Sequence, residues 1–491
     1  MRKRFALTAL AALALSAPAA GGEARAGPRR LTLLYLADLG GNLEPCGCSR
    51  NQRGGLPRLA AAVARIRAEN PETVLVAGGD LLFEFPLEPE QRSQELAKAR
   101  AAAEALRRMG LFASVVGERD RLAGDDFLRS TGLPFTRAAR SGPLGFGDLE
   151  HVPRAPVRVA VVQSGGTREA LALAGEARRR GVHLLLAAHR GSLLADDVNR
   201  AVLDGPVPVV QVQGRGQSLL RVDFLIRGDP SKGFAVLSGA AQREEELDLL
   251  AERRTEYARR RAEAEAAGNL SLAKALEGKL AELQARDKAL REAPLPVPPA
   301  DRPSMTIGFV VIADSLPEDP AVRAILTRTY GEVARENLAQ ARSARRPCPD
   351  PERDAPAFTG LDDPPRGGTF ACRTCHAAAA AFWERTPHAR AYETLAKAGR
   401  QYDLDCIRCH VTGWKEPGGP CTVADTEGRR DVQCEACHGP SSLHALDPPG
   451  HLRRAVPASV CQGCHTAEAS TAFDDGRYRE RVIGPGHGAR P

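Results

Sequence analysis

The last quarter of the chain repeats one short pattern, Cys-x-x-Cys-His, four times. Its copies are Cys372, Cys375 and His376; Cys406, Cys409 and His410; Cys434, Cys437 and His438; and Cys461, Cys464 and His465. Two thiols at this spacing add to the two vinyl groups of a porphyrin, and the adjacent imidazole then lies beneath the iron. Structural zinc and a disulfide framework also use cysteine pairs, but neither requires a histidine after every pair. The pattern therefore predicts four covalently bound c-type haems.

The second axial ligand of each iron is narrowed to histidine by composition. The chain has three methionines, Met1, Met109 and Met305, and none of them follows residue 347. Eight of the eleven histidines lie beyond that point, so two are available for each haem. The four outside the motifs are His388, His444, His451 and His487, and the alternative for each is an ordinary surface histidine. Two histidines per iron, without the thioether that raises the potential, predict low-potential electron carriers.

The two histidines of one iron are expected to come from different motifs. His376 and His388 are 12 residues apart, which is roughly 18 Å if the segment between them is helical. Ligands of one iron must lie close to it on opposite sides. One segment therefore bridges two haems, and this crossed ligation would bring the macrocycles within tunnelling reach.

Three runs in this region resemble the nitrifier-type tetrahaem cytochrome c family. They are Phe370-Ala-Cys-Arg-Thr-Cys-His376, Phe382-Trp-Glu-Arg-Thr-Pro-His388 and Cys434-Glu-Ala-Cys-His-Gly-Pro-Ser-Ser-Leu-His444. The similarity covers about residues 368 to 488, and it implies distal-ligand roles for His388 and His444. Some members of the family keep one haem five-coordinate, so the resemblance leaves the role of His451 open.

A second group of candidate ligands, Asp38, Asp80 and His189, lies in the N-terminal half, each after a predicted strand. α/β folds place their sites at such strand ends. The runs Leu31-Thr-Leu-Leu-Tyr-Leu-Ala-Asp38, Gly54-Gly-Leu-Pro-Arg-Leu59 and Val74-Leu-Val-Ala-Gly-Gly-Asp80 resemble the calcineurin-like metallophosphatases, especially the 5'-nucleotidase branch. In that family two metals activate water and stabilise a phosphoryl transition state.

Several ligands of that family are missing. Asp38-Leu39-Gly40 lacks the first histidine, and Gly117-Glu118-Arg119-Asp120 replaces an asparagine and a histidine. The later Gly-His-x-His is also absent from the sequence. The resemblance therefore implies at most one divalent metal, held by Asp38, Asp80 and His189 with help from Glu118 or Asp120. Phosphoesterase activity is not expected from so incomplete a centre.

Four cysteines fall outside the haem motifs. Cys46-Gly-Cys48 lies close to Asp38 and is a redox candidate: in an oxidising compartment it could form a disulfide, bind a soft metal, exchange electrons, or be an inert loop feature. Cys348 and Cys421 either pair with each other or stay free.

The segments that must position these residues have distinct patterns. Short β-rich runs alternate with helical stretches between residues 31 and 237, which predicts an α/β domain. The predicted strands are 31–37, 73–77, 157–163, 182–188 and 207–212. Leucines at heptad spacing between 241 and 292, interrupted at Gly268-Asn269, predict a helical hairpin. The alternative there is a solvated charged helix without a partner.

The predicted architecture is multidomain. It consists of a signal peptide (1–26), a metallophosphatase-like α/β sandwich (27–240), the helical hairpin (241–293), a linker (294–346), and a mostly α, haem-packed multihaem cytochrome c domain (347–491). The linker is predicted to contain one strand (306–312) and one helix (320–342). Prolines at 294, 296, 298 and 299 stiffen the linker, and a Pro-, Asp- and Arg-rich stretch at 345–365 marks the last boundary.

Export is predicted from the first residues. Arg2-Lys3-Arg4, an apolar run from Phe5 to Ala17 and the small residues around Ala24-Arg25-Ala26 have the order of a secretion signal. No later stretch has the roughly 20 apolar residues that a membrane helix needs. The net charge of +7 is scattered among acidic residues, which argues against a nucleic-acid partner.

These patterns together predict a periplasmic electron carrier that exchanges electrons with periplasmic redox proteins as donor and acceptor. One alternative is a haem-dependent reductase of a small nitrogen or sulfur compound with an open iron. Another is a metal-dependent phosphohydrolase with an attached cytochrome.

Overall fold

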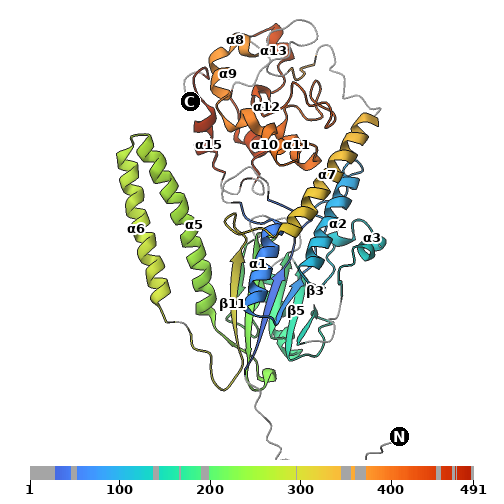
Figure 1. Cartoon of the computed structure of the whole chain (residues 1–491), viewed down its shortest axis with the longest axis vertical. Helices are drawn as coiled ribbons and strands as arrows, with labels where there is room; N and C mark the ends of the chain where they lie inside the picture. Colours follow the sequence, from blue (N-terminus) through green and yellow to red (C-terminus); the bar gives the residue numbers. More distant parts are fainter. Residues whose placement is uncertain are drawn as a thin grey trace, which may run out of the picture.

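The computed structural model describes residues 28–45, 52–136, 143–164, 167–189, 198–294, 296–343, 355–359, 372–448, 455–466, 470 and 473–487. Figure 1 shows an α/β body at the bottom, a helical module at the top that is coloured orange to red, and a long helical hairpin at the side. The predicted multidomain architecture, with an α/β sandwich, a hairpin and a mostly helical C-terminal module, is confirmed.

The α/β body contains two sheets. The first has the order β10 (Ala235–Val236), β11 (Ser304–Val311), β9 (Ser218–Ile226), β1 (Arg29–Leu36), β2 (Thr73–Ala77) and β3 (Leu111–Ser114). The second has the order β4 (Leu144–Asp148), β5 (Val157–Ser164), β6 (Leu184–His189), β8 (Val209–Gln211) and β7 (Arg200–Val202). β1 runs parallel to β2 and antiparallel to β9, so the ends of β1 and β2 lie at the same edge of the first sheet.

Strand β1 is rich in apolar residues that do not alternate with polar ones. Such a strand can be buried on both faces. Leu31, Leu33 and Tyr35 belong to the core between the two sheets. Leu34 and Leu36 point the other way, into a core beneath the helices. This arrangement fixes the direction in which the chain leaves β1 toward Asp38.

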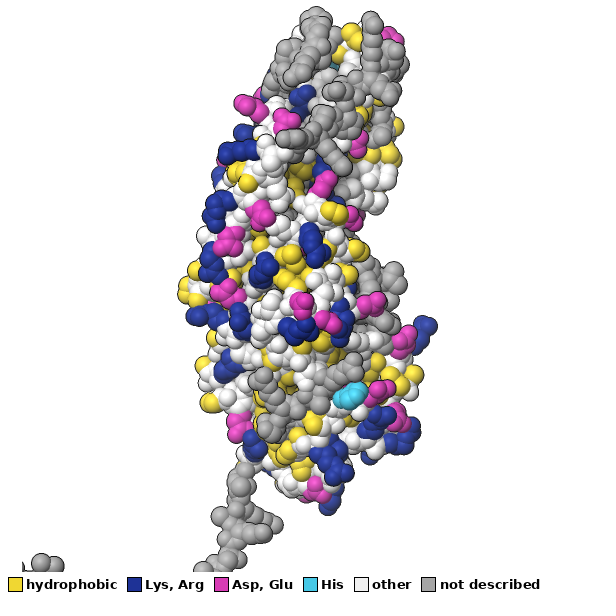
Figure 2. Space-filling model, turned by 90° about the vertical axis from the view of Figure 1, so that its right-hand side faces the viewer, with side chains coloured by type: hydrophobic (Ala, Val, Ile, Leu, Met, Phe, Trp, Pro, Cys, Tyr) yellow, Lys and Arg dark blue, Asp and Glu magenta, His cyan; other side chains and the backbone are white. Residues whose placement is uncertain are grey.

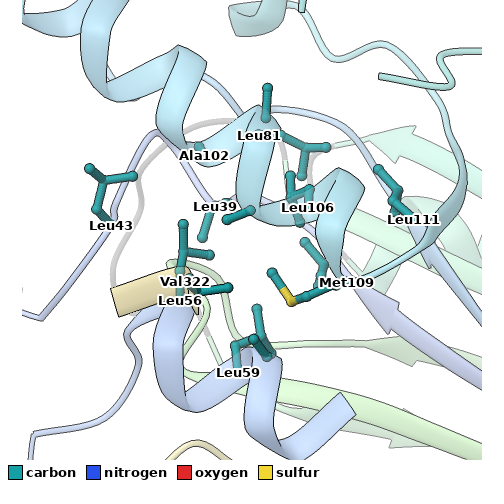
Figure 3. Close-up of a cluster of buried hydrophobic side chains, with 14 of the residues drawn as sticks. Leu39, Leu43, Leu56, Leu59, Leu81, Ala102, Leu106, Met109, Leu111 and Val322 are labelled. Atoms are coloured by element: carbon teal, nitrogen blue, oxygen red, sulfur yellow. The ribbon is translucent and has the colours of Figure 1, made fainter. Parts of the chain in front are cut away.

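Three helices cover the outer face of the first sheet: α1 (Leu56–Glu69), α2 (Arg92–Arg108) and α7 (Pro320–Ser343). Figure 3 shows their buried side chains, with Leu56, Leu59, Leu106, Met109 and Val322 gathered at the centre. Helix α4 (Thr167–Arg179) covers the second sheet through Ala170 and Ala174, and the short α3 (Asp125–Ser130) completes the body.

The structure revises the interpretation of residues 294–346 as a linker. Strand β11 pairs with β9 along its whole length, inside the first sheet. Helix α7 packs its buried face, including Val322, Ile325 and Leu326, into the same core as α1 and α2. The strand and helix were predicted at nearly these bounds, but both are part of the α/β body because they bury apolar surface against it.

The predicted hairpin is formed by α5 (Ser238–Ala266) and α6 (Leu270–Glu292). Asn269 caps α6 by accepting a hydrogen bond from the Leu272 N–H at 3.1 Å. Arg286 Nε lies 2.7 Å from Glu246 Oε1, which links the two helices. The chain enters the hairpin after β10 and returns to β11, so the hairpin is inserted at the edge of the first sheet.

The C-terminal module contains short helices joined by turns. They are α8 (Cys372–Cys375), α9 (Ala377–Trp383), α10 (Ala391–Lys397), α11 (Leu404–His410), α12 (Cys434–His438), α13 (Ser442–Leu446), α14 (Ala458–Gln462) and α15 (Asp475–Val482). Its largest apolar cluster is small and centres on Tyr392, Leu395, Ile407 and Val411.

Hydrogen bonds and apolar packing join this module to α2 and α7. Lys98 Nζ of α2 lies 2.9 Å from Asp403 Oδ1 and also bonds Asp405. The Asn337 side chain of α7 donates to the Tyr402 carbonyl at 2.7 Å. Leu338 and Ala341 of α7 pack against the apolar cluster of the module. Since Lys98 and Asp403 are both buried, the two modules meet as packed surfaces.

The surface has mixed charge. On the face in Figure 2, basic and acidic side chains are interspersed, as their scatter in the sequence predicts. Among the described residues, every helix is too short or too polar to serve as a bilayer span. The predicted signal peptide lies outside the described residues.

Candidate functional site

Each haem motif lies on or next to a short helix. The first occupies α8, the second ends α11, the third forms α12, and the fourth begins in α14. Because residues three apart lie on the same side of a helical turn, both sulfur atoms of a motif face the same way. All eight motif cysteines are outside disulfide bonds, as thioether formation requires.

The motifs are brought together in pairs through their sulfur atoms. The Cys434 side chain hydrogen-bonds Cys372, and this bond and burial raise the pKa of Cys434. The Cys464 side chain hydrogen-bonds Cys409, which lowers the pKa of Cys464. Cys437 lies close enough to Cys464 to interact electrostatically. The four attachment points therefore form one cluster.

Histidine rings from different motif segments lie in two pairs, each with a gap between the rings. The rings of His376 and His444 are stacked with centroids 6.3 Å apart and an interplanar angle of 25°. The rings of His388 and His465 have centroids 6.2 Å apart, tilted by 45°. Burial lowers the pKa of His388, and the neighbouring His465 lowers it further. Both gaps are too wide for direct ring contact.

The two centroid separations match those of two imidazoles bound to one iron ion. A metal–imidazole bond is about 2 Å long, so two imidazoles on opposite sides of one metal have centroids about 6 Å apart. Cysteine pairs outside disulfide bonds and histidine pairs at this separation are what a covalently bound haem needs. The residues of this module therefore fit haem c.

Two motif histidines are oriented through Nδ1. His410 Nδ1 donates to the Ala391 carbonyl at 2.5 Å, and His465 Nδ1 lies 2.9 Å from Ser470 Oγ. A hydrogen bond at Nδ1 fixes the tautomer and leaves Nε2 available for a metal. Burial lowers the pKa of both rings, which favours the neutral form that binds metal.

Glu435, inside the third motif, has a role that sequence reasoning missed. Its buried carboxylate accepts hydrogen bonds from the N–H groups of Thr359 at 2.9 Å and Ser441 at 2.8 Å, and from both hydroxyls. Ser442 then exchanges bonds with Ala357. Glu435 thus fixes the turn from which α13 carries His444. The sequence signal was a carboxylate between two haem cysteines, followed six residues later by serine.

His388 is held by a backbone bond from the segment before the third motif. Its carbonyl accepts the Val432 N–H at 3.1 Å, and Trp383 Nε1 donates to the Val432 carbonyl at 2.8 Å. The family-like run from Phe382 to His388 therefore supplies both the histidine and the indole that anchors it.

The remaining candidates for distal ligands are less constrained. His487 is exposed and lies edge-on to Phe382, with ring centroids 6.2 Å apart. His451 lies outside the described residues. The ligand roles of both stay predictions.

In the α/β body, Asp38 and Asp80 meet at one cation, the guanidinium of Arg119. Arg119 Nη2 lies 3.0 Å from Asp38 Oδ1, and Nε lies 3.2 Å from Asp80 Oδ2. The Arg119 N–H also donates to Asp80 Oδ1 at 2.7 Å. Sequence reasoning noted Arg119 only as the loss of a ligand.

Asp120, considered as a helper ligand, is engaged elsewhere. Its carboxylate accepts four backbone N–H groups, those of Asp80, Leu81, Leu82 and Gly117, at 2.7 to 3.0 Å. Burial raises the pKa of Asp120 to about 6 despite these bonds. Asp120 therefore shapes the loop that carries Asp80.

The other predicted N-terminal candidates are only partly described. His189 ends β6, but its side chain is outside the described part, as are Cys46 and Cys48. Glu118 is exposed. Among the described residues, no three His, Cys, Asp or Glu side chains converge as a metal site. The divalent-metal site and the redox role of Cys46-Gly-Cys48 stay predictions.

Cys421 is disulfide-bonded, so it is not a free thiol. Because the eight motif cysteines are outside disulfide bonds, its partner is not one of them. Its pairing with Cys348 stays a prediction, since Cys348 lies outside the described residues.

Comparison with solved structures finds a 5'-nucleotidase precursor and a sulfate thiohydrolase. A 5'-nucleotidase precursor from Thermus thermophilus is 14% identical, with a TM-score of 0.37, over 62% of this chain and 59% of that one. The sulfate thiohydrolase SoxB of the same genus is 14% identical, with a TM-score of 0.38, over 62% and 60%. The chain thus spans less than two thirds of either protein.

The C-terminal part is similar to a different group. Over 93 residues it is 36% identical to cytochrome c-554 of Nitrosomonas europaea, which is 16% of this chain and 40% of that protein. The reduced structure of that cytochrome matches 26% of this chain and 84% of its own, with 22% identity and a TM-score of 0.22. Residues 371–439 match the family Cytochrome c554 and c-prime. The resemblance predicted for the C-terminal module is confirmed: this segment is of the cytochrome c554 type.

Proposed function

We propose that the protein is a periplasmic electron carrier whose C-terminal module binds four c-type haems, mainly with two histidines on each iron. Electrons would enter from one periplasmic redox protein and leave to another. The cytochrome c554-type segment supports the class of chemistry. We propose, beyond this class of chemistry, the number of haems, their ligation and the periplasmic location.

One observation carries the ligation. The His376–His444 and His388–His465 ring pairs have nearly the same separation, 6.3 and 6.2 Å, and this separation suits two axial ligands of one iron. In each pair the two histidines come from segments around different motifs, so crossed ligation needs no rearrangement of the chain. Two haems would then share the segment from His376 to His388.

The clustering of the thiols supports electron transfer between haems. Cys372 contacts Cys434, and Cys409 contacts Cys464, so macrocycles attached at these positions lie next to each other. Haem supplies the redox change when it is bound. The protein contributes the attachment points, the axial histidines and the buried polar bonds that hold them in place.

The α/β body is proposed to act as a docking platform. Its helices α2 and α7 hold the segment just before the second motif through Lys98, Asn337 and Leu338. Cys406 of that motif packs against the same apolar cluster as Leu338 and Ala341 of α7. The second haem would therefore be attached against the body, leaving the other three motifs farther from it for redox partners.

Whole-protein mass and spectra of the holoprotein test the proposal. Matured protein should have the mass of the polypeptide plus four haems. His388→Gly and His444→Gly should each convert one low-spin iron into a high-spin iron that binds carbon monoxide, because each loses one axial ligand. The matched control is His151→Gly, since His151 is an exposed histidine of the α/β body that pairs with Asp148. Colourless protein, or the mass of polypeptide alone, would refute the proposal.

The same measurement separates the carrier from a haem-dependent reductase. A carrier saturated with histidine binds no carbon monoxide in the wild type. A reductase has at least one iron that binds it, and would then turn over a small nitrogen or sulfur compound.

A further inference from the structure

The place between the two strand-end aspartates is filled by a side chain of the protein itself. Asp38 follows β1 and Asp80 follows β2, the positions at which the metallophosphatase resemblance implies metal ligands. Arg119 reaches both carboxylates, with N–O distances of 3.0 and 3.2 Å. The three side chains are 79 to 90% buried. We propose that the Arg119 guanidinium is the permanent cation of this site and takes the place of divalent metal.

The chemistry of the guanidinium suits this role. It stays protonated at any physiological pH and presents several N–H donors in a fixed planar fork. Its Nη2 meets Asp38 and its Nε meets Asp80. It neutralises the carboxylates as a metal would, but it offers no open coordination position, so it activates no water.

Arg119 is held in place independently of its side chain. Its own N–H donates to Asp80 Oδ1 at 2.7 Å, and Asp120, the next residue, ties this turn to the loop after β2. Gly117 allows the close approach, because a Cβ there would lie 2.1 Å from Asp80 Oδ1. The turn is thus built around the bonded carboxylate.

Both aspartates have a strained backbone, which indicates that the direction of their carboxylates has a specific function. Asp38 has φ 52° and Asp80 has φ 51°, a left-handed conformation that residues other than glycine rarely adopt. The surrounding bonds maintain it: the Asp38 N–H donates to the Gly79 carbonyl at 3.1 Å. The strain aims both carboxylates at one point, and that point is occupied by Arg119.

A second ion pair closes the rim of the site. Arg215 pairs with Glu84, and Asn42 donates to the same carboxylate at 3.1 Å. The Arg215 N–H donates to the Asp38 carbonyl at 2.8 Å. An entering divalent cation would therefore meet two arginines beside its two carboxylate ligands, and it would have to break the bonds of Arg119 to bind.

The test is metal retention by the holoprotein, using Mn²⁺ and Zn²⁺ so that haem iron does not interfere. Wild-type protein incubated with either metal and dialysed should retain less than a tenth of an equivalent by elemental analysis. Its α/β body should melt at the same temperature with and without metal. Arg119→Gln, which removes the charge and shortens the side chain, should lower that melting temperature and bind Mn²⁺ at least tenfold more tightly. Arg121→Gln is the control, because Arg121 lies on the same turn but pairs with exposed Asp125.

Retention of one equivalent by wild type, lost in Asp38→Asn or Asp80→Asn, would overturn the proposal. So would Arg119→Gln protein that is as stable as wild type and still binds no metal, since Arg119 would then be dispensable. Should Arg119→Gln fail to fold, wild-type retention and Arg119→Lys decide: lysine keeps the charge, loses the fork, and should lower the melting temperature without admitting metal. The outcome does not depend on haem content, so it is distinct from a failure of the electron-carrier proposal.

Discussion

The two groups of candidate ligands in this chain are held in opposite ways. In the α/β body, Asp38 and Asp80 are drawn onto Arg119 at 3.0 and 3.2 Å. In the C-terminal module, His376 and His444 are kept 6.3 Å apart, ring to ring. The first site is closed by an internal cation and the second is open to an external one. Ligand-type residues therefore define a binding site only together with what lies between them.

A buried carboxylate supports each site from behind. Asp120 accepts four backbone N–H groups and shapes the turn carrying Arg119. Glu435 accepts two N–H groups and two hydroxyls and shapes the turn leading to His444. Both carboxylates replace a missing regular ladder of backbone bonds. The two sites therefore share this kind of support and differ in what lies between their candidate ligands.

The largest loss of stability is expected from breaking the junction between the α/β body and the C-terminal module. This junction decides whether the two sites belong to one rigid body. Burial lowers the pKa of Lys98, but Asp403, Asp405 and Glu95 outweigh it, so the pKa is raised and the ammonium stays charged. Lys98→Met leaves Asp403 buried without this partner, which costs about 4 kcal/mol. Hydrogen exchange in α11 should then become at least a hundredfold faster. Lys397→Met, at an exposed i,i+4 pair, is the control, and equal exchange in both variants would mean that the modules dock by other contacts.

The closed site is tested by Asp120→Asn. The amide has one acceptor oxygen where the carboxylate has two, and its NH₂ group faces backbone donors. We expect a loss of about 3 kcal/mol in the stability of the α/β body, measured by chemical denaturation followed by circular dichroism. The spectra of the haems should not change. A loss below about 0.5 kcal/mol would show that the four bonds do not hold the turn.

The open site is tested in the same way by Glu435→Gln, with an expected loss of about 2 kcal/mol, since two of its four donors are hydroxyls that can turn elsewhere. The more telling measurement is electron paramagnetic resonance. A loosened His444 should broaden or shift one low-spin signal and leave the His388–His465 signal unchanged. Glu384→Gln, at an exposed carboxylate that pairs with Arg373, is the matched control and should leave both signals in place.

The parts of the fold set by local sequence were predictable. Thr73–Ala77 forms a strand at the predicted bounds, because a β-branched run is flanked by proline and glycine. Helix α7 begins at the predicted Pro320, where Asp319 accepts the next N–H groups. The haem motifs are equally local, since thiols and histidine lie within five residues.

The parts set by long-range contacts were not predictable. Strand β11 was assigned to a linker because its partner β9 lies about 80 residues earlier in the chain. The pairing of His376 with His444 joins residues 68 apart, and only the principle of crossing could be derived beforehand. Arg119 looked like a lost ligand because its contacts with Asp38 and Asp80 depend on three loops meeting at one edge of the sheet.

The smallest effect is the pH dependence of the closed site. Burial raises the pKa of Asp120 to about 6 from its usual value of 3.8. The folded protein therefore holds this proton more tightly than the unfolded chain, so stability from this group is greatest at low pH and falls as pH rises toward and through 6. Between pH 5 and 7 the α/β body should lose about 1 kcal/mol. Denaturation of wild type and Asp120→Asn across this range checks the sign: the wild type should weaken with pH relative to the variant, which has no proton to lose. A wild type that instead gains stability relative to the variant would mean that the backbone N–H bonds to Asp120 outweigh its burial.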